Sequence, residues 1–335
     1  MGIKYLNRYL TNHCSANSIS KQPLSEFRNK VFVIDASIYL YRFVESNMLV
    51  EGFYNMVSIF KKYRITPIFV FDGKPPVEKK ELLEKRRIEK NRAEKAYNDL
   101  KIQLDEIGVC EDTSAREKHT EILSEMETLK KRFVRIKPSD IQTIKQLLSA
   151  YGTQYIESAG EADQLCAYMV LQNLAWACVS DDMDMFLYGC PRVIRHISLI
   201  HHTGILYNTS SIFDELQISY DTFRDITILS GTDYNLHQKI YLYDTMKWYR
   251  KYIENASGED YTKSSFYSWL VAHAKYTIDP DALSKIRDMF DLTLFQRNNT
   301  NKLLAIGQEI RLFRSGTPDK ATLQSILREY GFIFI

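Results

Sequence analysis

Seven carboxylates are spread from residue 35 to residue 233 of a 335-residue chain, and most of them stand where a predicted strand ends or a predicted helix begins. They are Asp35, Asp72, Glu161, Asp163, Asp182, Asp184 and Asp233. A carboxylate at the end of a buried strand is held at the rim of a sheet, where several strands can bring charged groups together. Because such groups repel one another, the pattern predicts a site for cations with oxygen ligands, such as Mg²⁺.

The chemistry that this set favours is hydrolysis of a phosphodiester by two Mg²⁺ ions about 4 Å apart, with Mn²⁺ able to substitute. One ion lowers the pKa of the attacking water, and the other stabilises the leaving oxygen.

The 7 histidines and 5 cysteines show no spacing typical of zinc, of a disulfide framework or of a nucleophile and its base. Taken singly, each Asp after a strand could instead be a cap or turn residue. Glu161 and Asp163 could instead only stabilise the N-terminus of a helix through its dipole. These structural roles remain alternatives to metal binding.

Two apolar runs that end in Asp, residues 31–35 (VFVID) and 67–72 (PIFVFD), predict buried parallel strands. Apolar residues at helical spacing between them are typical of the crossover helix of a βαβ unit. Residues 175–180 predict a third strand, preceded by a helix over about 161–173. The chain after Asp233 is expected to be mostly helical, with a polar loop at 298–302 and a short last strand at 331–335.

Two further helices are predicted to be unusually polar. Residues 79–95 contain eight basic and four acidic residues and few apolar ones, and a second charged helix is expected over about 117–135. A helix without an apolar stripe should project into solvent or line a passage.

The overall composition places the chain among globular proteins but does not identify a partner. Hydrophobic residues make up 45% of the chain and the net charge is only +2, so total charge does not indicate nucleic acid. The sequence has neither the apolar segment of a signal peptide nor a run long enough to span a membrane. We therefore expect no membrane partner, and an intracellular monomer in the nucleus or a viral replication compartment rather than a secreted protein.

The order of several short motifs resembles the structure-specific 5′ nucleases of the PIN-like superfamily, and within them the flap endonucleases. The matching strings are MGI at the N-terminus, VIDAS at 33–37, FVFDGKPP at 69–76, GEADQLCA at 160–167, SDDMDMFLYG at 180–189 and ILSGTDYN at 228–235. The resemblance implies an α/β fold, a PIN-like/5′-nuclease core with a central, mostly parallel sheet flanked by helices. It divides the chain into an N-terminal nuclease region (1–76), a helical gateway or arch insertion (77–137), an internal nuclease region (138–235) and a mostly helical C-terminal DNA-binding part (236–335).

The resemblance also implies roles for individual residues. All seven carboxylates match the family's metal site, with Asp163 standing where close relatives carry Glu. Lys79 and Arg86 match basic residues that contact the scissile phosphate, and with Asp35, Asp72 and Asp184 they form the expected catalytic set. The remaining matches bind DNA: Tyr41 stacks on a base, Arg132 and Arg135 belong to the arch through which a 5′ single strand threads, and Gly2 lies near the active site.

The chain departs from the family after Asp233. The glycine-rich element that holds K⁺ against duplex DNA is not evident, since no glycine occurs from residue 234 to residue 256. We therefore expect duplex binding to depend on basic residues such as Lys239 and Lys247, without a specific K⁺ site. Residues 324–330 resemble a sliding-clamp binding peptide only faintly and give no clear motif. The low glycine count and the lack of a basic C-terminal extension would suit a large DNA virus, and a cellular source is also open.

The leading hypothesis is a Mg²⁺-dependent 5′ flap endonuclease that cuts branched or flapped DNA near single-strand/double-strand junctions in replication or repair. A 5′ to 3′ exonuclease of the same superfamily is the alternative enzyme, and RNA is an alternative substrate. A catalytically inactive nucleic-acid-binding scaffold is the alternative from another class. Such scaffolds normally lose site carboxylates, whereas all seven positions here are acidic.

Overall fold

The computed structural model describes residues 3–107, 113–234, 241–255, 266–274, 279–312 and 316–334. These residues cluster into two units. The first unit comprises Met1–Ala36, Met56–Pro75 and Thr153–Gly316, and the second comprises Ser37–Asn55, Pro76–Gly152 and Thr317–Ile335. The four-segment division expected from the sequence follows chain order and stays a prediction.

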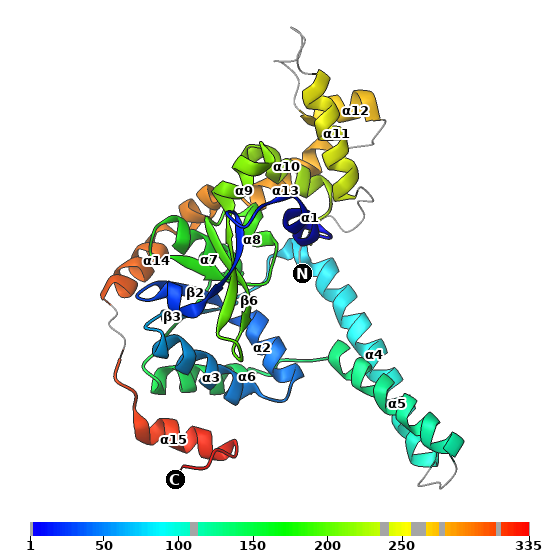
Figure 1. Ribbon diagram of the computed structural model, residues 1–335, viewed down its shortest axis with the longest axis vertical. Coiled ribbons are helices and arrows are strands. Elements are labelled where there is room, and N and C mark those ends of the chain that lie inside the picture. The colour runs from blue at the N-terminus through cyan, green and yellow to red at the C-terminus, as the bar shows by residue number, and fades with distance from the viewer. Residues whose placement is uncertain are drawn as a thin grey trace. The chain divides into compact units, whose positions relative to one another are not determined.

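A seven-stranded sheet forms the centre of the first unit (Figure 1). Its strands are β1 (Ile19–Pro23), β2 (Val31–Asp35), β3 (Thr66–Phe71), β4 (Gln154–Glu157), β5 (Ala177–Val179), β6 (Arg192–Ser198) and β7 (Thr203–Asn208). The order is β1-β7-β6-β5-β2-β3-β4. The β6, β5, β2, β3 and β4 strands pair in parallel, while β7 is antiparallel to both of its neighbours. The expected mostly parallel sheet is therefore confirmed, and β2, β3 and β5 are the three strands predicted from the sequence.

Most helices of the first unit contribute side chains to one buried hydrophobic core. The helices of this unit are α1 (Leu6–His13), the 3₁₀ helix η1 (Leu24–Phe27), α7 (Ala162–Leu171), α8 (Asp184–Leu187), α9 (Thr209–Leu216), α10 (Tyr220–Leu229), α11 (Leu242–Asn255), α12 (Phe266–Ala274), α13 (Pro280–Met289) and α14 (Leu292–Leu312). The α7 helix packs on β2, β3 and β5 and is buried almost all round, as expected for the crossover helix predicted there.

The region after Asp233 is helical, as predicted, but the loop expected at 298–302 is wrong. Helix α14 continues through these residues with a kink at Asn299. The Asn299 side-chain amide donates to the Phe295 carbonyl at 2.9 Å, which keeps the kinked turn hydrogen-bonded. The polar composition of residues 298–302 therefore corresponds to a kink within the helix and not to a loop. Within the described ranges, every helix is too short or too polar to cross a lipid bilayer.

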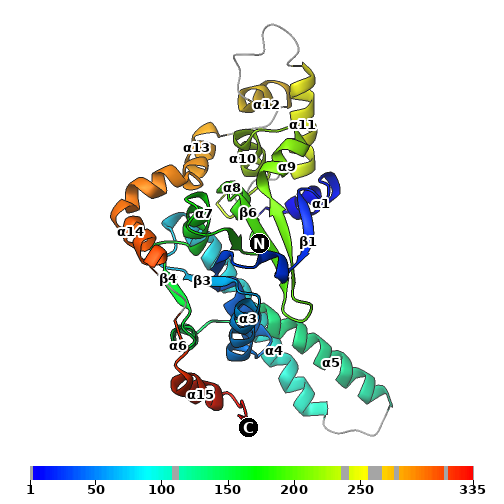
Figure 2. The same cartoon turned by 60° about the vertical axis from the view of Figure 1, so that its left-hand side comes forward.

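The second unit contains the two charged helices, α4 (Lys80–Ile107) and α5 (Thr113–Arg132). They run side by side in both views (Figures 1 and 2). The expectation that they lack an apolar stripe is wrong, because a narrow seam between them buries Ala93, Ile122, Met126 and Leu129. Pairing two long helices needs only this seam, since their other faces remain polar.

The other helices of the second unit are α2 (Ala36–Glu45), α3 (Leu49–Lys62), the 3₁₀ helix η2 (Val77–Lys79), α6 (Pro138–Ala150) and α15 (Lys320–Glu329), with the ends of α2 and α3 shared with the first unit. Helix α15 packs on α6, and the Asp319 amide donates to the Ala150 carbonyl at 2.8 Å. Residues 331–334 form no strand, so the short last strand expected there is wrong within this range.

Candidate active site

The carboxyl ends of three neighbouring parallel strands define one edge of the sheet in the first unit. Strand β2 ends at Asp35, Asp72 follows β3 directly, and Ser180 follows β5. The strand order continues from β2 to β3 and β4 on one side and to β5 and β6 on the other. In open α/β sheets, ligands bind at such a switch point beyond the carboxyl ends of the strands.

The N-terminus of α7 brings Glu161 and Asp163 to the end of β3. The Ala162 amide donates to Asp72 Oδ1 at 2.7 Å, and the Gly73 amide donates to the Gly160 carbonyl at 2.7 Å. An unpaired amide at a helix start attracts an anion, so the helix orients the Asp72 carboxylate. Three of the predicted site residues therefore lie together here.

The segment after β5 carries Asp182 and Asp184. The Ser180 hydroxyl lies 3.5 Å from Asp35 Oδ2 and accepts from the Asp182 amide at 3.2 Å. Asp184 begins helix α8, and its amide donates to Asp182 Oδ1 at 3.1 Å. Asp181 is turned toward β6, where its carboxylate accepts from the His196 amide at 2.7 Å.

Asp233 lies partly buried in the turn that follows α10. Its neighbour Tyr234 donates from its hydroxyl to Glu161 Oε2 at 2.8 Å, which joins this turn to the start of α7. Sequence reasoning did not single out Tyr234 as a site residue. A contact between positions 73 residues apart has no signal in local spacing.

Electrostatic effects on buried neighbours show that carboxylates from several segments share one environment. Burial first, and then the charges of Asp163, Glu161 and Asp184 among others, raise the pKa of Tyr188 well above its usual value. Burial and the same three carboxylates also raise the pKa of Tyr234. Burial raises the pKa of Cys166 to about 11, with smaller contributions from Asp35 and Asp163. The field in this region is therefore negative.

The donors of this region fit a divalent cation that takes oxygen ligands. Asp35, Asp163 and Asp184 are at least nine-tenths buried, and carboxylates so placed are stabilised by a cation. Among the described residues, no three His, Cys, Asp or Glu side chains lie close enough together to hold a metal ion as they stand. Mg²⁺ keeps several of its waters and is often bound through only one or two carboxylates, which this arrangement can provide.

Two family patterns match the segments that build this site. The XPG N-terminal domain matches residues 1–93, and the XPG I-region matches residues 152–233. Flap endonuclease 1 of Methanococcus aeolicus is 33% identical over 239 residues, which are 66% of this chain and 68% of the relative. The chain belongs to the flap endonuclease family. Flap endonuclease 1 of Theileria parva is 30% identical over 341 residues, covering 90% of this chain and 63% of the relative.

The chain spans about two thirds of the length of these flap endonucleases. Among solved structures, the catalytic core of Rad2 in complex with DNA substrate is similar with a TM-score of 0.65 and 19% identity, covering 98% of this chain and 95% of that one. The Holliday junction-resolving enzyme GEN1 in complex with product DNA and Mg²⁺ is similar with a TM-score of 0.57 and 16% identity, covering 98% and 73%. At these identities the likeness shows the fold.

The second unit carries the basic and aromatic residues that the flap endonuclease resemblance assigns to DNA. Lys79 ends η2 and is buried, while Arg86 is partly buried on α4. Tyr41 on α2 is 42% exposed, and Lys90 Nζ lies 4.8 Å from the centre of its ring. Lys90 thus occupies one face of the ring expected to stack on a base.

The predicted arch residues differ in their surroundings. Arg132, the last residue of α5, is exposed. Arg135 is bound to the side chains of Asn91 at 2.8 Å and Glu94 at 2.7 Å, so its guanidinium ties the end of this segment to α4. Lys247 is exposed on α11. Gly2 and Lys239 lie outside the described residues.

Proposed function

We propose that this chain is a Mg²⁺-dependent 5′ flap endonuclease that hydrolyses phosphodiester bonds in DNA near junctions between single and double strands. The observation that carries the proposal is that the segments bearing Asp35, Asp72, Glu161, Asp163 and Asp184 meet at one edge of the sheet. Family membership supports the same reaction, because the similar proteins are named flap endonuclease 1. We propose that the protein works inside the cell, in DNA replication or repair.

The seven carboxylates would hold two metal ions, with Mn²⁺ able to replace Mg²⁺. When bound, Mg²⁺ supplies Lewis-acid chemistry, which activates a water and stabilises the leaving oxygen. The chain itself orients the ligands. The Ala162 amide holds Asp72, the Asp184 amide holds Asp182, and Tyr234 holds Glu161, each by a hydrogen bond.

Residues outside this cluster are proposed to hold the DNA strand. Lys79 and Arg86 are seven positions apart, so they lie on similar faces of a helical segment, and we propose that both contact the scissile phosphate. Tyr41 would stack on a base next to the cut, since aromatic stacking is tolerant of sequence. Arg132, Arg135 and Lys247 would contact the phosphate backbone.

The proposal is tested by comparing wild type with Asp184→Asn on a 5′-labelled flap substrate while Mg²⁺ is titrated. Asp184 is 1% exposed, and Asn has nearly the same volume, so the change removes the charge with little effect on packing. We expect cleavage to fall by at least about a hundredfold with flap binding retained. The matched control is Asp214→Ala on α9, whose side chain is exposed and belongs to no part of the site.

Product lengths distinguish this activity from 5′ to 3′ exonuclease activity. An endonuclease releases the flap as one oligonucleotide of defined length, whereas an exonuclease releases mononucleotides from the labelled end. The same flap made of RNA tests the choice of nucleic acid. Unchanged cleavage by Asp184→Asn, or cleavage by wild type in EDTA, would reject the proposed role of the carboxylates.

A further inference from the structure

Tyr234 binds the carboxylate of Glu161, which does not cap the helix that it precedes. Glu161 is the N-cap residue of α7, yet its side chain makes no capping hydrogen bond. Its Oε2 instead accepts the Tyr234 hydroxyl at 2.8 Å. A hydrogen bond to a charged acceptor is stronger than one between neutral groups, so the hydroxyl restricts the direction in which Glu161 points.

Tyr188 is a second tyrosine in the same region, buried and packed against Phe290. Tyr188 directly follows helix α8 in the chain, and the residue is 2% exposed. Within the described part of the chain its hydroxyl is buried and has no hydrogen-bond partner. Burial, and after it the charge of Asp163, raises the pKa of this hydroxyl well above its usual value. Leaving a buried hydroxyl without a partner destabilises the fold, and such a group is tolerated most readily where it has a function.

Phe290 packs between the two tyrosines. Its ring centre lies 5.0 Å from that of Tyr188 and 5.5 Å from that of Tyr234, and its side chain is fully buried. The Gln164 side chain also donates to the Met289 carbonyl at 3.3 Å, which ties the first turns of α7 to the end of α13. We call Tyr188, Phe290 and Tyr234 the aromatic clamp.

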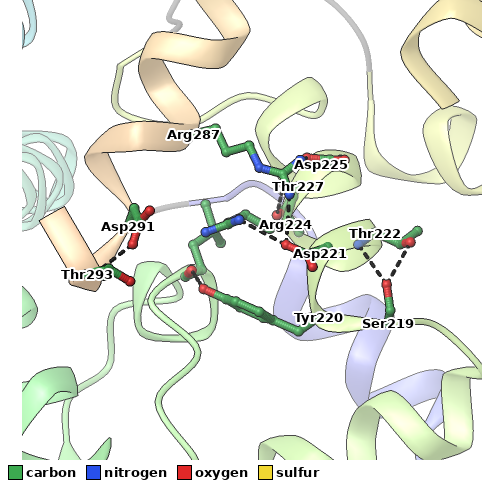
Figure 3. A network of polar contacts seen from close by, with 11 residues as sticks. Ser219, Tyr220, Asp221, Thr222, Arg224, Asp225, Thr227, Arg287, Asp291 and Thr293 are labelled. Atoms are coloured by element: carbon green, nitrogen blue, oxygen red, sulfur yellow. Dashed lines mark hydrogen bonds and ion pairs between the residues drawn. The ribbon is translucent and has the colours of Figure 1, made fainter. Parts of the chain in front are cut away.

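A polar network ties helix α13, which Phe290 directly follows, to helix α10 (Figure 3). Arg287 on α13 donates to Asp221 at 2.8 Å and to Asp225, both on α10. Helix α10 leads into the turn that contains Tyr234, so the same network orients the segments on both sides of the clamp.

We propose that Tyr188 and Tyr234 are positioning residues that orient the carboxylates of Asp163 and Glu161 for metal binding. Tyr234 does so through its hydrogen bond to Glu161. The Tyr188 hydroxyl, which has no partner among the described residues, would donate to Asp163 or to a bound water only in the metal-loaded site. The inference rests on the proposed function, because it assigns these carboxylates to metal.

The experiment uses Tyr188→Phe and Tyr234→Phe, which remove the hydroxyls and keep the rings packed on Phe290. Binding of Mn²⁺ alone to the full chain is measured by the electron paramagnetic resonance signal of the free ion. We expect each change to weaken Mn²⁺ binding about tenfold, as is typical for groups that orient metal ligands. Tyr63→Phe is the matched control, because it removes a hydroxyl bound to His202 Nδ1 at 2.8 Å in the same unit.

Melting of the metal-free protein separates positioning from a purely structural role. Because the Tyr188 hydroxyl is buried without a partner, Tyr188→Phe should leave the metal-free melting temperature unchanged or raise it while Mn²⁺ binding weakens. Mn²⁺ binding equal to wild type in both variants would overturn the inference and leave the proposed function standing. Wild type that binds no Mn²⁺, or Asp184→Asn that binds as wild type does, would overturn both.

Discussion

Arg195 provides the sharpest test of how the fold supports the loop that carries Asp182 and Asp184. It lies on β6 and is 5% exposed. One guanidinium nitrogen donates to Asn7 Oδ1 on α1 at 2.5 Å, and another donates to the Asp181 carbonyl at 2.8 Å. The cation therefore joins the N-terminal helix to the segment after β5.

Replacing this residue by Arg195→Met keeps an unbranched apolar stem and removes the charged donors. Hydrogen bonds from charged groups contribute about 1.5–3 kcal/mol each, and part of that loss is offset because a buried charge no longer has to be desolvated. We expect a net loss of about 3 kcal/mol in the free energy of unfolding. With a urea dependence of about 3 kcal/mol per molar, the midpoint should fall by about 1 M.

Tryptophan fluorescence reports this unfolding specifically, because Trp176, Trp248 and Trp269 are the chain's three tryptophans and all belong to the same unit as Arg195. The partner variant is Asn7→Ala, which removes one of the two bonds. The double variant should show a coupling energy of about 1–2 kcal/mol between the two positions.

A coupling below about 0.5 kcal/mol would refute this account of Arg195, because independent sites add within that limit. A loosened Asp181 segment should also raise the Mg²⁺ concentration needed for half-maximal cleavage by Arg195→Met. Such a shift would connect the stability of the fold to the metal site.

Three further predictions concern pH, close packing and DNA. Glu215 accepts hydrogen bonds from the segment between α1 and β1, which lower its pKa below the ordinary 4.5. The wild-type advantage in melting temperature over Glu215→Gln should therefore persist above pH 4.5 and vanish as the pH falls through the lowered pKa. Gly73→Ala should lower the urea midpoint of unfolding and reduce cleavage, because the added Cβ would lie 2.3 Å from the Ser158 carbonyl oxygen. At Gly307 the nearest atom to an added Cβ is 3.8 Å away, so Gly307→Ala should raise the free energy of unfolding by about 0.5–1 kcal/mol. Lys247→Ala should weaken duplex binding and lower its salt dependence by about one ion, with equal affinity in K⁺ and Na⁺ at matched ionic strength.

Local patterns in the sequence determined the strands and helices nearest the site. The run at 31–35 is strand β2 with its predicted bounds, and the strand expected at 67–72 is β3, shifted by one residue. The helix expected at about 161–173 is α7, with Glu161 and Asp163 at its start. A continuous apolar run or a helical period depends on near neighbours in the chain, so it can be interpreted without the fold. The motifs likewise led to the right family.

Strands β1, β4, β6 and β7 were not predicted, and the packing between charged helices was misjudged. Strand β4 has only four residues, and the β6 and β7 pair includes an irregular register near Arg195. Short or irregular strands depend on pairing with partners elsewhere in the chain more than on their own composition. The apolar contact between α4 and α5 was not predicted for a similar reason, since each helix alone contributes too few apolar residues to form a stripe.

The sequence by itself determined which acidic residues end strands or begin helices, and therefore which chemistry to expect. Only the tertiary structure decided that β5 lies beside β2, so that the segment of Asp182 and Asp184 reaches the end of the strand that carries Asp35. Only it placed the Tyr234 hydroxyl against Glu161 and packed Phe290 against both Tyr188 and Tyr234. The physical reason is that contacts between remote segments follow from strand order and packing, which no local periodicity encodes.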